Sequence, residues 1–173
     1  MRKIFLLLVA VLISMNLALS CSKKEQKEID TDLSQEDINL LIKHKKSIDR
    51  ITGKYDAELQ KTQQSERAAV VEKGKNEIDA YLKSHELSPV AFMRKSKKIL
   101  KGYLAFQEIS DESLKNKMSL LEKENLTEKE IRDKETLYKN AAERAFKELT
   151  SELSDYEIQL VKSNLKSLSA IVK

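Results

Sequence analysis

One local pattern recurs four times in the chain and constrains its fold more than any other feature. In each copy a leucine precedes a serine or threonine, and an apolar residue stands four positions after the hydroxyl residue. The hydroxyl can cap the N-terminus of a helix, while the two apolar residues close a hydrophobic staple around the cap. The copies begin at Leu33-Ser34, Leu87-Ser88, Leu126-Thr127 and Leu153-Ser154. The pattern therefore predicts four helix starts.

Neighbouring residues support three of these starts. Thr127 with Glu130, and Ser154 with Glu157, have the spacing of a capping box, in which each residue satisfies a backbone N–H of the other. Pro89 follows Ser88 and takes the first helical position, where a missing N–H costs nothing.

The remaining sequence also favours helices. The chain has 173 residues with three glycines, one proline, 35% charged residues and 5% aromatic residues. Few helix breakers and apolar residues at three-or-four spacing indicate amphipathic helices, and no segment of residues 33–173 is apolar all round. We therefore expect an all-α fold, a helical bundle or stacked helical hairpins of about five to six helices, including a short one over 111–124.

The apolar pattern leaves the number of helices open in one segment and predicts a single helix in another. Residues 34–85 form either one long helix or two, and we favour a bend near 62–66 because residues 60–67 carry no apolar side chain. Gly53 weakens the first part without having to break it. From Ser154 a single apolar stripe reaches Val172, which predicts one last helix.

The segment after Ser88 is sharply amphipathic and carries a basic face. Phe92, Ile99 and Tyr103 fall on its apolar arc, which we interpret as core. The opposite arc holds Arg94, Lys95, Lys97, Lys98 and Lys101. These five residues are either a solvated helix face or a patch for an anionic ligand, such as anionic lipid or an acidic polymer. We expect no nucleic-acid partner.

The N-terminus has the layout of an export signal. Met1-Arg2-Lys3 is basic, residues 4–13 are apolar, and small residues follow. An uncleaved membrane helix is the alternative, but Ser14 and Asn16 interrupt the apolar run well short of about 20 residues. The residues Leu17-Ala18-Leu19-Ser20-Cys21 resemble the lipobox of bacterial lipoproteins, although the commonest pattern has Leu at the place of Ala18 and Gly or Ala at that of Ser20.

The resemblance implies how the chain is processed and where it is located. It implies a diacylglyceryl group on the Cys21 sulfur, cleavage between Ser20 and Cys21, and acylation of the new amino terminus. Two acyl chains give stable membrane anchoring. In known sorting systems an Asp directly after the lipidated cysteine favours retention in the inner membrane. This chain has Ser22 at that position, so the sequence slightly favours the outer membrane. It leaves open whether the protein lies on the periplasmic or the surface face of that membrane. Cys21 is the only cysteine, and its alternative role is that of a buried structural thiol.

These features divide the chain into a signal peptide (1–20), a lipidated cysteine with a disordered tether (21–32) and a helical domain (33–173). The tether holds one apolar residue and cannot bury enough surface to order itself. Loss of Arg2 and Lys3 with the signal peptide lowers the formal charge from +4 to +2.

Residues suited to catalysis are few. His44 and His85 are the only histidines, and neither has the spacing of a zinc or di-iron motif. The glycines stand singly, and acid pairs such as Glu122 and Glu124 suit a helix surface better than a general acid, which needs a pocket. We expect no catalytic residue, metal or cofactor.

Three hypotheses about function follow. The first is a membrane-anchored, non-catalytic binding or structural module of the cell envelope, of which a small chaperone is a variant. The second is a surface-exposed lipoprotein that binds host or acidic polymer ligands through Arg94 to Lys101. The third hypothesis is a catalytic function, that of an enzyme.

Overall fold

The structure is a computed structural model, and it describes residues 32–121 and 126–172. Every regular element in these residues is helical, so the fold is all-α and consistent with a helical bundle. The signal peptide, Cys21 and all of the predicted tether except Asp32 lie outside the described residues. So does the predicted end of the helix over 111–124.

The described residues form two compact units, which divide the predicted domain 33–173. Residues 32–97 and 167–172 make the first unit, and the described part of 98–166 makes the second. Helix α4 (Pro89–Glu108) contributes its first half to one unit and its second half to the other.

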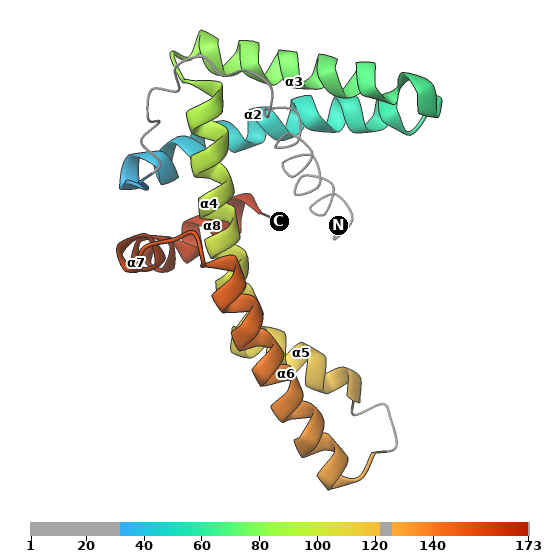
Figure 1. Cartoon of the computed structure of the whole chain (residues 1–173), viewed down its shortest axis with the longest axis vertical. Helices are drawn as coiled ribbons and strands as arrows, with labels where there is room; N and C mark the ends of the chain where they lie inside the picture. The colour runs from blue at the N-terminus through green and yellow to red at the C-terminus, as the bar shows by residue number, and fades with distance from the viewer. Residues whose placement is uncertain (1–31, 122–125, 173) are drawn as a thin grey trace. The chain divides into compact units, whose positions relative to one another are not determined.

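A helical hairpin forms most of the first unit. Helix α2 (Gln35–Leu59) runs antiparallel to α3 (Arg67–Ser84), and the short 3-10 helix η1 (Gln64–Glu66) lies in the turn between them (Figure 1). The predicted bend near 62–66 is therefore confirmed. Ile38, Leu41 and Leu82 are fully buried in this unit.

The second unit contains the rest of α4 and four further elements. These are α5 (Asp111–Leu121), α6 (Glu128–Leu149), α7 (Asp155–Ser163) and the start of α8 (Leu165–Ile171). Helices α5 and α6 form a second hairpin (Figure 1). Ile99, Ala105 and Val161 are fully buried in this unit.

All four predicted helix starts are present. The side chains of Ser34, Thr127 and Ser154 each accept a hydrogen bond from the backbone N–H three residues later, and all three form complete capping boxes. The Ser88 hydroxyl accepts a longer one, 3.5 Å, from Ala91 N–H. Each cap depends only on residues within one helical turn, which is why the sequence alone locates it.

The prediction of a single C-terminal helix is wrong in one respect. The helix ends at Ser163, and α8 begins after Asn164. The Asn164 side-chain amide donates to the Leu160 carbonyl oxygen at 2.9 Å, an acceptor that a continuing helix would use. Asparagine competes in this way with backbone hydrogen bonds.

The surroundings of two glycines predict different effects of glycine-to-alanine substitution on stability. Gly53 lies in the interior of α2, and an added Cβ would meet nothing within 4 Å. Gly53→Ala should raise the free energy of unfolding by about 0.5–1 kcal/mol, because alanine loses less backbone entropy in a helix. Urea denaturation of the variant measures this gain.

Gly102→Ala is the matched control. Its Cβ would lie 3.0 Å from Leu153 Cδ1 and 3.2 Å from Val161 Cγ2, so the helix gain is offset by overpacking. Equal stabilisation by both substitutions would contradict this interpretation.

Candidate functional site

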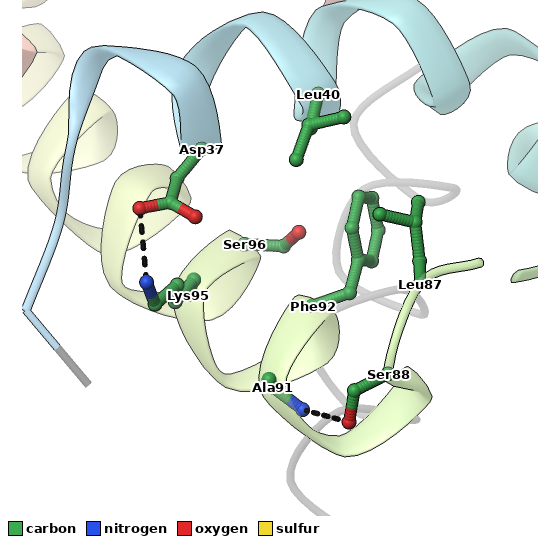
Figure 2. Close-up of a pocket in the computed structure, with 8 residues that line it drawn as sticks. All are labelled: Asp37, Leu40, Leu87, Ser88, Ala91, Phe92, Lys95 and Ser96. Atoms are coloured by element: carbon green, nitrogen blue, oxygen red, sulfur yellow. Dashed lines mark hydrogen bonds and ion pairs between the residues drawn. The ribbon is translucent and has the colours of Figure 1, made fainter. Parts of the chain in front are cut away.

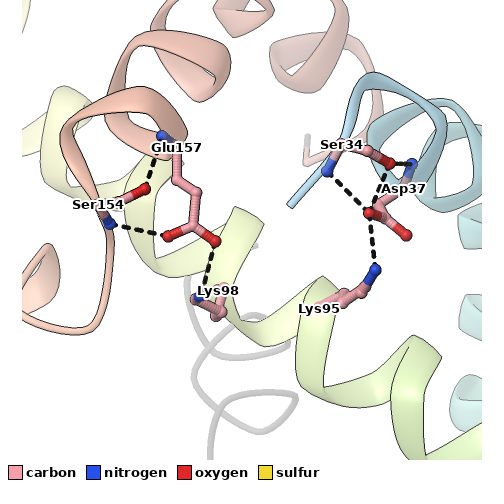
Figure 3. A network of polar contacts seen from close by, with 6 residues as sticks. All are labelled: Ser34, Asp37, Lys95, Lys98, Ser154 and Glu157. Carbon is pink, nitrogen blue, oxygen red and sulfur yellow. Dashed lines mark hydrogen bonds and ion pairs between the residues drawn. The ribbon is translucent and has the colours of Figure 1, made fainter. Parts of the chain in front are cut away.

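The basic residues of α4 are largely neutralised within the chain. In the first unit, Lys95 Nζ lies 3.1 Å from Asp37 Oδ2 (Figure 3). In the second unit, Lys98 Nζ lies 2.6 Å from Glu157 Oε1, and Lys101 Nζ lies 2.9 Å from Glu152 Oε1.

The other two basic residues differ in exposure. Arg94 is exposed and Lys97 is half-buried. Carboxylates thus hold three of the five side chains that the sequence suggested as an anionic-ligand patch. Two positive charges on a helix are a weak basis for such a patch.

A groove in the first unit lies between the N-terminal turns of α2 and α4. Its volume is about 300 Å³, and its walls come from apolar and polar side chains of both helices and of the segment before α4. The lining residues are Asp37, Leu40, Leu87, Ser88, Ala91, Phe92, Lys95 and Ser96 (Figure 2). The staple residues Leu87 and Phe92 therefore serve both the helix start and the groove.

The polar groups of the groove are only partly satisfied. Asp37 Oδ2 accepts hydrogen bonds from Ser34 N–H (2.8 Å), Ser34 Oγ–H (2.7 Å) and Lys95 Nζ (3.1 Å), which fixes the carboxylate in place. Its other oxygen, Oδ1, receives no hydrogen bond from the described residues. The Ser96 hydroxyl also has no hydrogen-bond partner among them, and its oxygen is open to solvent at the groove.

Beside the groove, the two histidines meet in a cluster that the sequence analysis missed. His44 is 2% exposed, and its Nδ1 lies 2.9 Å from the Tyr81 hydroxyl. The His85 ring centroid lies 4.9 Å from that of His44, and the Phe92 ring meets His44 edge-on. The sequence offered one signal for this cluster, the four-residue spacing between Tyr81 in the last turn of α3 and His85, which follows that helix. The contact of both with His44 was not visible in the sequence.

Burial lowers the pKa of His44 below its usual value of 6.5, and the nearby charges of His85 and Lys43 lower that pKa further. Removal of the imidazolium from water disfavours the charged form. The ring is therefore a neutral, hydrogen-bonded part of the core at pH 7.

The second unit has a smaller groove of about 160 Å³ between the α5 and α6 hairpin and the end of α4. Tyr138, Ala142 and Leu114 line it, together with charged residues of both signs. Among the described residues of this unit, Leu137 is an exposed large apolar side chain on α6, at 64%.

Neither a metal site nor a membrane span occurs in the described part of the chain. No group of three or more His, Cys, Asp or Glu residues there could hold a metal ion. No helix within residues 32–121 and 126–172 is long and apolar enough to cross a bilayer. Cys21, the predicted lipid attachment site, and the adjoining cleavage site at Ser20 lie outside these residues.

The comparisons with known proteins add no family to this description. No protein-family model, curated protein or solved structure matches the chain.

Proposed function

We propose that the protein is a bacterial lipoprotein whose helical domain acts as a non-catalytic binding or structural module of the cell envelope. The export signal and Cys21, the only cysteine, support the membrane anchor. The observation that carries the binding role is the groove between α2 and α4, with apolar walls and two open polar groups.

The chemistry of the groove favours recognition over catalysis. A serine nucleophile needs a base within hydrogen-bond reach, and the Ser96 hydroxyl has no such neighbour among the described residues. Asp37 is held by Lys95 and by both donors of Ser34. A carboxylate fixed in this way is suited to orienting the donor group of a ligand.

Binding of acidic ligands through the basic face of α4 is not favoured by a specific observation. Lys95, Lys98 and Lys101 already contact carboxylates of the chain, and an incoming anion would have to displace them. We therefore propose one function.

Acyl labelling tests the anchor. Cells grown with an alkyne fatty acid should incorporate the label into the wild-type protein but not into Cys21→Ala, because the sulfur that accepts the lipid is absent. The intact mass of the wild-type protein should fit a chain that begins at Cys21 with attached lipid. Ser22→Ala is the matched control and should be labelled as wild type. Equal labelling of Cys21→Ala and wild type would refute the anchor.

Photo-crosslinking in living cells tests the binding role. A photoreactive residue placed in turn at exposed positions of both units should give a discrete adduct with an envelope component at some of them. Failure at every position in both units would refute the role of binding module and leave a structural one.

A further inference from the structure

The groove of the first unit has features that point to the chemistry of its ligand. Leu40, Ala91 and Leu87 are half-buried, so the walls remain open to solvent along their length. A volume of about 300 Å³ lies at the lower end of the range of ligand pockets. The groove therefore suits one side chain with its adjoining backbone, rather than an enclosed cofactor.

The polar groups in the groove match a peptide group. Asp37 Oδ1 is an open acceptor, and the Ser96 hydroxyl is an open donor directed towards the space between Leu40 and Phe92 (Figure 2). A peptide backbone offers the reverse pair, an N–H donor and a C=O acceptor, at every residue other than proline. Asp37 Oδ1 and the Ser96 hydroxyl both reach solvent, since none of the buried side-chain nitrogen or oxygen atoms among the described residues lacks a hydrogen bond, so a peptide group would replace water at them.

The charges in the groove select against a simple ion. Asp37 and Lys95 neutralise each other across a 3.1 Å ion pair, so neither an anion nor a cation gains a net attraction. Apolar contact with Leu40, Leu87 and Phe92 then provides the main driving force.

We propose that the groove between α2 and α4 binds an extended peptide segment through one apolar side chain. The side chain packs on Leu40, Leu87 and Phe92. The backbone of the same segment donates to Asp37 Oδ1 and accepts from Ser96 Oγ–H. This inference rests on the proposed function, because it names the class of partner that the module recognises.

Two capped pentapeptides serve as probes, acetyl-Gly-Ser-Leu-Ser-Gly-amide and the same peptide with serine at the centre. The full chain, as purified from the producing cells, is placed in phospholipid nanodiscs and titrated with each peptide by NMR. The leucine peptide should shift the signals of Ala91 and Ser96 in a saturable way, and the serine peptide should bind at least tenfold more weakly. Equal binding of the two peptides, or shifts confined to other residues, would overturn the proposal.

Two variants of groove residues test whether the peptide binds in the groove or elsewhere on the chain. Ala91→Leu fills the groove and should weaken binding of the leucine peptide by about tenfold or more. Ala141→Leu, the same substitution at an exposed position of α6, is the matched control and should leave it unchanged. Ser96→Ala removes one hydrogen bond and should weaken binding roughly fivefold even if Ala91→Leu does not fold. The proposal would be overturned if every groove variant that folds bound the leucine peptide with wild-type affinity.

Failure of the peptide-binding experiment can be distinguished from failure of the proposed function. Acyl labelling reports on Cys21 and does not involve the groove. A chain that crosslinks to envelope partners elsewhere but does not bind the leucine peptide remains a binding module with a different recognition surface.

Discussion

Glu157→Ala should lower the free energy of unfolding by about 3–5 kcal/mol, the cost of removing one partner of a buried ion pair. The Glu157 side chain is 4% exposed, and the Lys98 ammonium 2.6 Å away belongs to a side chain that is 13% exposed. Glu157 also accepts a hydrogen bond from Ser154 N–H at 2.8 Å and so completes the capping box of α7 (Figure 3). The substitution removes both the carboxylate beside Lys98 and half of the cap.

Glu152→Ala is the matched control. Glu152 pairs with Lys101 in the same unit at 2.9 Å, but its side chain is 57% exposed. Exposed pairs contribute about 0–1 kcal/mol, because water screens them and side-chain entropy opposes them. Urea denaturation of both variants measures the difference. Equal costs would show that burial does not govern the strength of the Glu157 pair.

The stability of the first unit should fall as the pH is lowered below 6.5. The pKa of His44 is lowered in the folded chain, first by burial and then by the charges of His85 and Lys43. In the unfolded chain the same ring takes up a proton near pH 6.5, so the unfolded state binds more protons below that pH. The stabilising contribution of neutral His44 is therefore fully present above pH 6.5. It is lost as the pH falls towards the lower pKa that His44 has in the folded chain.

His44→Gln tests the origin of this pH dependence. Glutamine can still bond to the Tyr81 hydroxyl but does not titrate, so the free energies of unfolding at pH 7.5 and pH 5 should differ less than in wild type. His85→Gln removes one neighbouring charge but leaves His44 buried, so most of the wild-type pH dependence should persist. An identical pH dependence in wild type and His44→Gln would contradict the assignment to His44.

Local sequence rules located most of the helical elements. The caps at Ser34, Thr127 and Ser154 need only residues within one turn, and all three formed as predicted. The polar run 60–67 likewise indicated the turn between α2 and α3. The break at Asn164 was missed because an asparagine side chain competes with the helix without interrupting the apolar stripe.

The candidate site could not be found in the same way. Asp37 and Lys95 are 58 residues apart, and His44 and Tyr81 are 37 apart, so no spacing rule relates them. Sequence analysis grouped Lys95 with its basic neighbours on one helical face, whereas packing placed a carboxylate against it. The open groups of the groove, Asp37 Oδ1 and Ser96 Oγ, carry no sequence signature of their own.

The sequence by itself determined the helical class and the helix starts, and its Cys21 predicts attachment to a membrane through lipid. Caps, apolar periodicity and the pattern of the predicted export signal are local, and each is contained within a turn or a short segment. Only the tertiary structure decided which charges are paired, that His44 is buried against Tyr81, and that α2 and α4 border an open groove. These features depend on side chains brought together by helix packing, and many helix arrangements are compatible with the same apolar stripes.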